Sequence, residues 1–330
     1  MAEVVLEHVS KSFGHITAVN DLSITISDGG FVVLLGPTGA GKTTTLRLIA
    51  GLEKLDGGSI HLNGRDVGSE SPAQRDVAMV FQQYSLYPHM TVRENLSFPL
   101  KSPAFNLSDA EIINKVNEVA RTLQIAHKLD NNATQLSGGE MQRVSIGRAL
   151  VRDPQLYLMD EPLSSLDAKL RADLRVELKR IHADLGATLL YVTHDQIEAM
   201  TMATKIGVLE EGRLAQFGSP REIYGNPHNV YVASRLGIPR INILPSHLFS
   251  GDHKGPQIGL RPENIVEGEG VDARVTRTEH LGDQTRLHLD LKGHPVITLI
   301  GVHADYATGT TIKIGPRNPL YFDAQGKRVF

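Results

Sequence analysis

The residues with the clearest chemical use form a glycine-rich loop between two regular segments. In the stretch FVVLLGPTGAGKTTTL, residues 31–46, Gly36, Gly41, Lys42 and Thr43 match the phosphate-loop pattern G-x-x-x-x-G-K-[ST]. An apolar, partly β-branched run before the loop predicts a buried strand, and the residues after it predict a helix. In this context the pattern binds phosphate, because backbone N–H groups and the positive end of the helix converge on one point.

The loop predicts a site for a polyphosphate and a magnesium ion. Lys42 can reach the β and γ phosphates as a point charge, and Thr43 can offer its hydroxyl to Mg²⁺. A glycine-rich turn with a solvated lysine is the structural alternative. A chance match to the pattern in a chain of this length is rare, on the order of one in a hundred. The residues expected to surround the phosphates are Gly36, Pro37, Thr38, Gly39, Ala40, Gly41, Lys42, Thr43 and Thr44.

Two adjacent carboxylates end another apolar segment. In PQLYLMDEP, Asp160 and Glu161 follow a run that includes Leu156 and Leu158 and precede Pro162. Placing such a pair at the end of a buried strand costs free energy unless something there needs it. Asp160 suits a Mg²⁺ shell, and Glu161 suits a base that accepts a proton from a water aligned with the γ phosphate. The alternative is an ordinary acidic pair between a strand and a loop.

A histidine and a glutamine follow two further predicted strands. His194 ends the strand in ATLLYVTHD, and Gln82 comes directly after residues 77–81. His194 can contact a γ phosphate or position the attacking water, although a single histidine at a strand end is more often structural. The carboxyl ends of parallel strands share one edge of a sheet, where ligands bind. Gly36, Asp160 and His194 all fall at that edge, and this convergence favours a functional site.

Two other candidates have an open structural interpretation. Phe13, in SKSFGHITAV, can stack on a base or pack within a small β layer. The segment LSGGEMQR, residues 136–143, places Ser137, Gly138 and Gly139 at the start of a predicted helix, where they form a second possible anion site. Ser-Gly-Gly is also an ordinary N-terminal turn, which is the simpler interpretation of this segment alone.

The composition excludes several classes of protein. The chain has 330 residues, a formal net charge of −3, a pI near 6.5 and no cysteine. It therefore has no overall basic field for nucleic acid and no disulfide or thiolate chemistry. The amino terminus does not resemble a signal peptide, and no segment approaches the ~20 apolar residues that cross a bilayer. We expect a soluble protein that can still dock on a membrane protein.

The order of the patterns predicts two domains. Strand and helix patterns alternate over residues 1–235 and predict an α/β domain, with a helical subdomain at about residues 86–152. In that subdomain Ser108 and Glu111 form a capping box before an amphipathic helix. From residue 236 the chain is rich in Gly, Thr and Val and shows the alternation of strands. Residues 236–330 therefore predict a small all-β domain, in which we find no catalytic constellation.

Taken in order, the motifs resemble one protein family. GPTGAGKT, FQQYSLYPHMTV, LSGGEMQR, LYLMDEP, SSLD and VTH resemble the ATPase subunits of ABC transporters across the whole first domain. GLRPEN and the β pattern of the second domain resemble the regulatory, oligonucleotide-binding-like (TOBE) region of the MalK-like carbohydrate-importer branch. The resemblance implies a RecA-like P-loop core with a helical subdomain, followed by that small all-β domain.

The resemblance also implies a nucleotide and residue roles. ATP and Mg²⁺ would bind at the phosphate loop, with Phe13 stacked on adenine. Thr43 and Asp160 would hold the metal, and Gln82 would contact both the metal and the attacking water. Catalysis would depend on Glu161, His194 and Gln82.

The partners implied by the resemblance begin with a second copy of the chain. Two copies would stack head to tail, so that each ATP lies between the phosphate loop of one and Ser137, Gly138 and Gly139 of the other, while Asp167 bridges the two sites. Two transmembrane permease subunits would dock a coupling helix in a groove lined by residues 84–90 and the helix that follows them. An extracytoplasmic solute-binding protein would join through the complex. The chain would lie, as a peripheral subunit, on the cytoplasmic side of the inner membrane.

The expected function is ATP hydrolysis that drives carbohydrate import. Importers of polyamine, iron or another solute remain an alternative, because the ATPase does not touch the solute. A clamp on nucleic acid or the ribosome is disfavoured by the single phosphate loop and the acidic balance, so no nucleic-acid partner is expected. One departure from the family pattern is Glu140, where the signature usually has glutamine. Its carboxylate would lie near the bound phosphates and weaken the contact with the second copy.

Overall fold

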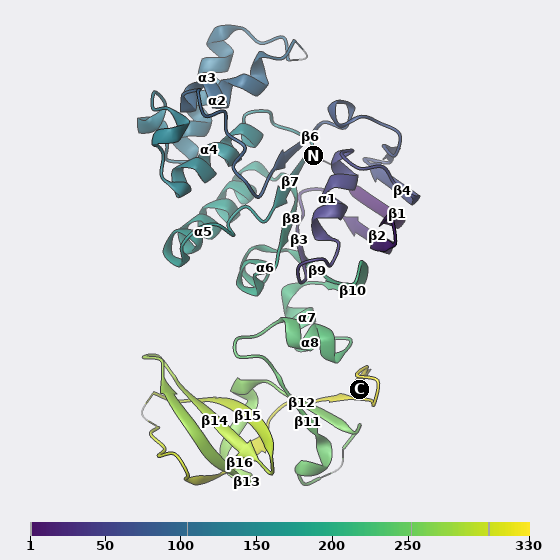
Figure 1. The fold of residues 1–330 in the computed structure, drawn as a ribbon, viewed down its shortest axis with the longest axis vertical. Coiled ribbons are helices and arrows are strands. Elements are labelled where there is room, and N and C mark those ends of the chain that lie inside the picture. The colour runs from purple at the N-terminus through teal and green to yellow at the C-terminus, as the bar shows by residue number, and fades with distance from the viewer. Residues whose placement is uncertain (1, 104, 252, 303) are drawn as a thin grey trace. The chain divides into compact units, whose positions relative to one another are not determined.

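A six-stranded sheet in the order β10-β9-β3-β8-β7-β6 lies at the centre of the first part of the molecule (Figure 1). Neighbouring strands are parallel except for the pair β9 and β10. Every residue of β3, β7 and β8 is buried, as expected for parallel strands that are covered on both faces. The strands are β3 (Phe31–Leu35), β6 (Val77–Val80), β7 (Leu156–Asp160), β8 (Thr188–Thr193), β9 (Lys205–Glu210) and β10 (Arg213–Gly218).

The computed structural model describes residues 2–103, 105–251, 253–302 and 304–330. The chain divides into two compact units, Met1–Pro220 and Arg221–Phe330. Among the described residues, no helix is both long enough and apolar enough to cross a membrane.

A second, antiparallel sheet belongs to the first unit and has the order β2-β1-β4-β5. Its apolar residues, including Val4, Leu22 and Ile60, join one core cluster with residues of β3, α1 and β7. This cluster fixes the start of the phosphate loop against the antiparallel layer. The strands are β1 (Val4–Phe13), β2 (Ile16–Ile26), β4 (Gly57–Leu62) and β5 (Arg65–Asp66).

Six α-helices complete the described part of the first unit. Figure 1 shows α2, α3 and α4 gathered beside the sheet, and all three fall within the range predicted as a helical subdomain. The capping box predicted at Ser108 is present at the start of α3, which buries Ile112 and Val116. The helices are α1 (Lys42–Ala50), α2 (Val92–Ser97), α3 (Asp109–Thr122), α4 (Gly138–Leu150), α5 (Ala168–Leu185) and α6 (Gln196–Met202).

The second unit consists mostly of two antiparallel sheets, in the orders β11-β12-β17-β18 and β15-β14-β13-β16. The alternation predicted at residues 271–275 and 287–291 lies in β13 and β14, whose inward residues form a core with β12 and β16. The strands are β11 (Asn242–Pro245), β12 (Gln257–Leu260), β13 (Ile265–His280), β14 (Thr285–Leu291), β15 (His294–Ile300), β16 (Thr311–Pro316), β17 (Leu320–Phe322) and β18 (Arg328–Val329).

Two short helices, α7 (Pro220–Gly225) and α8 (Val230–Arg235), pack with this second unit. The buried Arg261 guanidinium donates hydrogen bonds to the carbonyl oxygens of Ala233 and Leu236 and, at 2.9 Å, to that of Tyr224. The predicted domain boundary near residue 235 lies after these helices, whereas the division between the units lies before most of them. Composition alone does not reveal this, because distant segments hold the helices in place. They do so through the Arg261 hydrogen bonds, the packing of Ala233 with Phe322 and a backbone hydrogen bond from Val230 to Gly326.

Candidate functional site

The phosphate loop joins β3 to α1 and requires glycine directly before the helix. Gly41 has φ 94°, in the left-handed region that favours glycine. A Cβ atom at this residue would lie 2.3 Å from the carbonyl oxygen of Ala18. Among the described residues no side chain caps α1, so the first N–H groups of this helix stay available to an anion.

The Lys42 ammonium connects the loop to the acidic pair after β7. Its Nζ donates hydrogen bonds of 3.0 Å to the carbonyl oxygens of Gly36 and Pro37 and lies 3.3 Å from Glu161 Oε1. The side chain is only 5% exposed. The predicted meeting of the phosphate loop with the carboxylates of DEP is therefore present in the structure.

Thr43 and Asp160 form a second link between the same segments. The Thr43 hydroxyl donates a hydrogen bond of 2.9 Å to Asp160 Oδ1. Burial raises the pKa of the Asp160 carboxyl above its ordinary value. The hydrogen bond from Thr43 lowers this pKa, and the negative charge of Glu161 raises it. A hydroxyl beside a carboxylate offers the hard oxygen ligands that Mg²⁺ prefers. The described residues contain no cluster of three acidic, histidine or cysteine side chains for a metal, so this pair suits an ion held partly by phosphates and water.

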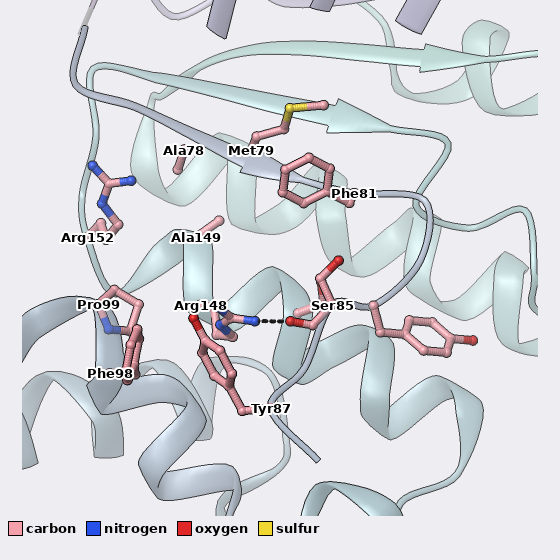
Figure 2. Close-up of a pocket in the computed structure, with 12 residues that line it drawn as sticks. Ala78, Met79, Phe81, Ser85, Tyr87, Phe98, Pro99, Arg148, Ala149 and Arg152 are labelled. Carbon is pink, nitrogen blue, oxygen red and sulfur yellow. Dashed lines mark hydrogen bonds between the residues drawn. The ribbon is translucent and has the colours of Figure 1, made fainter. Parts of the chain in front are cut away.

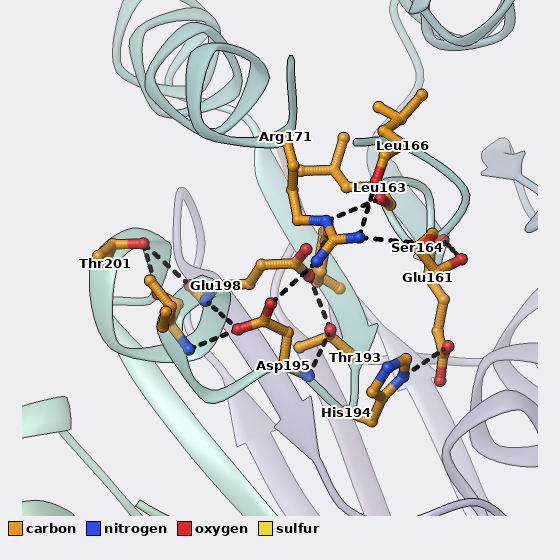
Figure 3. Close-up of polar contacts among 12 residues, drawn as sticks. Glu161, Leu163, Ser164, Leu166, Arg171, Thr193, His194, Asp195, Glu198 and Thr201 are labelled. Carbon is orange, nitrogen blue, oxygen red and sulfur yellow. Dashed lines mark hydrogen bonds and ion pairs between the residues drawn. The ribbon is translucent and has the colours of Figure 1, made fainter. Parts of the chain in front are cut away.

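Glu161 and His194 meet across the ends of β7 and β8 (Figure 3). His194 Nδ1 lies 2.9 Å from Glu161 Oε2, so each carboxylate oxygen of Glu161 has one basic neighbour, Lys42 or His194. Glu161 has φ 43°, which is costly for a residue with a side chain. The His194 side chain is 58% exposed, so the pair lies at the surface of the sheet edge.

Gln82 and Phe13 are both exposed. Gln82 follows the end of β6, at the same edge of the sheet as the acidic pair. Phe13 is the last residue of β1 and is 46% exposed as a residue, and Lys11 Nζ lies 5.2 Å from its ring centroid. Of the two interpretations of Phe13, the exposed ring agrees better with a stacking surface than with a packed core position.

Ser137 and Asp167 act as helix caps. Ser137 is the N-cap of α4, and its N–H and hydroxyl donate to Glu140 Oε2 at 2.8 and 2.9 Å. Asp167 is the N-cap of α5 and accepts hydrogen bonds from the N–H groups of Lys169 and Leu170. The structure brings together the loop residues, Asp160, Glu161 and His194, whereas these contacts of Ser137 lie within its own helix.

The sequence patterns missed Lys128 and Arg171. Lys128 Nζ lies 3.1 Å from Glu140 Oε1, and the hydrogen bond from the N–H of Ser137 is the main cause that lowers the pKa of the Glu140 carboxyl. Arg171 lies in the first turn of α5, where a positive charge opposes the helix dipole. That placement does not by itself single out Arg171, because Lys169 lies in the same turn. No local pattern identifies Lys128, because its pairing depends on the tertiary fold.

A groove lies beside the segment after β6 (Figure 2). Its volume is about 260 Å³, and its lining includes Tyr84, Ser85 and Tyr87 from the range predicted to receive a coupling helix. The rings of Tyr87 and Phe98 lie 4.6 Å apart, and the Arg148 guanidinium stacks over Tyr87 and donates to the carbonyl oxygen of Ser85. The groove therefore combines aromatic surface with two cations, Arg148 and Arg152.

Two family models match the chain. One, described as ABC transporter, matches residues 19–164, and the other, described as TOBE domain, matches residues 258–330. These matches confirm the predicted type of each domain and their order along the chain.

The chain is similar over nearly its whole length to curated proteins. It is 44% identical to the uncharacterized ABC transporter ATP-binding protein y4oS of Sinorhizobium fredii, over 96% of this chain and 91% of that protein. It is 43% identical to the sn-glycerol-3-phosphate import ATP-binding protein UgpC of Ruegeria sp., over 100% and 99%. It is 46% identical to the trehalose import ATP-binding protein SugC of Mycobacterium tuberculosis, over 88% and 79%.

Solved structures agree with the core fold. A nucleotide-free ATP-binding cassette from an ABC transporter matches with a TM-score of 0.59 and 28% identity, over 66% of this chain and 92% of its own. A dimeric ATP-binding cassette in a post-hydrolysis state, bound to ADP and Pi, matches with a TM-score of 0.60 and 30% identity, over 66% and 99%. The predicted nucleotide-binding P-loop core is confirmed. The chain therefore belongs to the ABC transporter family, as one of its ATP-binding ATPase subunits.

Proposed function

We propose that this chain hydrolyses ATP to drive the import of a carbohydrate. The observation that carries the proposal is the meeting of Lys42, Thr43, Asp160 and Glu161 at one edge of the parallel sheet. The names of similar proteins, which are import subunits for sn-glycerol-3-phosphate and trehalose, support import and a solute of the carbohydrate class.

The residues of the loop fit the phosphates of ATP. The uncapped N–H groups at the start of α1 and the Lys42 ammonium supply positive charge, and Phe13 supplies an exposed ring for the base. Thr43, Asp160 and Gln82 would hold Mg²⁺, which neutralises phosphate charge when bound. The full set proposed to surround the nucleotide is Phe13, Gly36, Pro37, Thr38, Gly39, Ala40, Gly41, Lys42, Thr43, Thr44 and Asp160.

Glu161 is the group best placed to accept the proton of the attacking water. Its carboxylate already lies between two basic side chains, Lys42 and His194, which orient its two oxygens. His194 would hold the water or the γ phosphate from the exposed side, and Gln82 would orient the water from the end of β6. Glutamine at residue 161 would keep the shape of this site and remove the base.

A second copy of the chain would complete each site. Ser137, Gly138 and Gly139 would face the phosphates bound by the other copy, and Asp167 would lie between the two sites. Ser137 and Asp167 are both at helix starts, where N–H groups and hydroxyls favour negative charge. The dimeric cassette that matches this chain supports such an assembly.

The groove of Figure 2 fits a helix from a transmembrane permease. Tyr87 and Phe98 supply apolar contact area, and Arg148 supplies a donor for the carbonyl end of a helix. Gln82 lies in the chain between Phe81 and Tyr84, which both line this groove, so docking there can reach the catalytic edge. With two such permease subunits and an extracytoplasmic solute-binding protein, the chain would work at the cytoplasmic side of the inner membrane.

Reconstitution tests this function directly. The chain is placed in proteoliposomes with its two permease subunits and the solute-binding protein, and ATP-dependent uptake is measured for trehalose, sn-glycerol-3-phosphate, spermidine and ferric iron. Uptake of one of the first two, lost in Lys42→Ala, is the expected result. Uptake of spermidine or iron alone would replace carbohydrate by that solute class, and ATP hydrolysis without any transport would contradict the importer role.

A further inference from the structure

The Arg171 guanidinium holds the segment that follows the acidic pair (Figure 3). Its Nε donates to the carbonyl oxygen of Leu163 at 3.2 Å, and its Nη2 donates to those of Leu166 at 2.8 Å and Ser164 at 3.4 Å. These three carbonyls lie between Glu161 and Asp167 in the chain. One side chain from α5 therefore fixes the path of the whole connection.

The same guanidinium reaches the segment after β8. Arg171 Nη1 lies 3.6 Å from Asp195 Oδ2, and Asp195 directly follows His194. The other oxygen of Asp195 caps α6 by accepting from the N–H groups of Ile197 and Glu198, and the N–H of Asp195 donates to Thr193 Oγ1. Asp195 is thus fixed on its own segment while it pairs with Arg171.

The two joined segments carry the two side chains that meet at the sheet edge. Glu161 has the costly positive φ, and Ser164 holds it there, because the Ser164 N–H and hydroxyl both donate to the Glu161 carbonyl oxygen at 3.2 and 2.8 Å. The backbone of Ser164 is in turn held by Arg171. A rigid connection on one side and a capped aspartate on the other set the position of His194 relative to Glu161.

We propose that Arg171 is a positioning residue for ATP hydrolysis, which keeps the Glu161 and His194 segments in register. This role rests on the proposed function. Arg171 does not cap the start of α5, because a guanidinium only donates hydrogen bonds, whereas the Asp167 carboxylate accepts from two N–H groups there. The planar guanidinium fork spans several carbonyls and a carboxylate at once, whereas a lysine ammonium is a point charge and cannot reproduce that set.

Steady-state ATP hydrolysis and equilibrium nucleotide binding, measured on the full chain in its permease complex, test this role. We expect Arg171→Met to lower kcat by about 10- to 100-fold, the cost of a small misplacement of catalytic groups, with the Kd for ATP changed less than about threefold. Arg171→Lys keeps the positive charge and is therefore more certain to fold. Its kcat is expected to be almost as low as that of Arg171→Met. Arg180→Met, an exposed arginine on the same helix, is the matched control and should leave kcat unchanged.

Coupling to Asp195 separates positioning from simple stabilisation. Asp195→Asn should also lower kcat, and the double variant with Arg171→Met should be no worse than Arg171→Met alone, because the two side chains act as one unit. The positioning role would be overturned if the variants had a lower melting temperature but an unchanged kcat per folded subunit. It would also be overturned if the losses in kcat of the two single variants multiplied in the double variant. Absence of ATP hydrolysis in the unmodified complex would instead overturn the proposed function, and this role with it.

Discussion

Two glycine-rich turns enter helices in the first unit, and the structure treats them differently. At the start of α1, Gly41 supplies no cap, and Lys42 lies over the loop with Glu161 in contact. At the start of α4, Ser137 forms a complete capping box with Glu140. The same local pattern therefore leaves N–H groups open in one place and occupies them with a carboxylate in the other.

This difference shows that the start of a helix can bind an anion only when no side chain of the helix already occupies its free N–H groups. The first turn gathers its cation, hydroxyl and carboxylates from one chain, so it can bind nucleotide alone. At the second turn an incoming phosphate would compete with Glu140 for Ser137, and Lys128 offsets part of the Glu140 charge. We therefore expect the first turn to set nucleotide affinity and the second to set how firmly two copies associate.

The largest expected effect is the loss of nucleotide binding in Lys42→Ala. Removing the ammonium leaves Glu161 Oε1 without its basic neighbour and the phosphates without their strongest charge, so the affinity for ATP should fall by about 100-fold. Titration with a fluorescent ATP analogue measures it, with Lys101→Ala, an exposed lysine, as the control. An unchanged affinity for ATP in Lys42→Ala would show that the first turn does not set nucleotide affinity, and would contradict the difference drawn between the two turns.

A smaller effect is expected from Asp160→Asn, and it depends on pH. Because burial raises the pKa of Asp160, protons compete with Mg²⁺ at a higher pH than for an ordinary aspartate. In the unmodified chain the gain in ATP affinity on adding Mg²⁺ should therefore shrink as the pH falls. The variant should show a gain about 10-fold smaller and with a weaker dependence on pH, because only the phosphates then titrate. Binding of ATP without Mg²⁺ serves as the control. A gain of the same size and with the same dependence on pH in the variant as in the unmodified chain would remove Asp160 from the metal.

The smallest expected effect concerns Glu140. The substitution Glu140→Gln keeps an acceptor oxygen for the Ser137 N–H but removes the negative charge from the start of α4. In a Glu161→Gln background, the ATP concentration that gives half-maximal dimer should fall by about two- to fivefold. Glu111→Gln removes the same kind of cap at α3 and is the matched control. Equal midpoints for both variants would show that the Glu140 carboxylate does not compete with phosphate.

The sequence predicted those parts of the site that are formed by residues close together in the chain. The strand, loop and helix around Gly36 and Lys42, the acidic pair and the cap at Ser108 all follow from patterns a few residues long. The sheet order brings the ends of β3, β7 and β8 together, as the alternation of strands and helices predicted.

The contacts that depend on distant residues could not be predicted in this way. Arg171 reaches Asp195 across the sheet edge, Lys128 reaches Glu140, and Arg261 holds α7 and α8 to the second unit. A sequence pattern shows the residue types at these positions but not their partners, because the partners come from separate segments brought together by folding.

The most direct measurement is the size of the Glu161→Gln variant with and without Mg-ATP, by light scattering coupled to gel filtration. We expect a monomer without nucleotide and a dimer with Mg-ATP, since binding is kept and hydrolysis is removed. The double variant Lys42→Ala/Glu161→Gln should stay monomeric. A Glu161→Gln chain that binds ATP but remains a monomer, or that still hydrolyses ATP at the normal rate, would contradict the account.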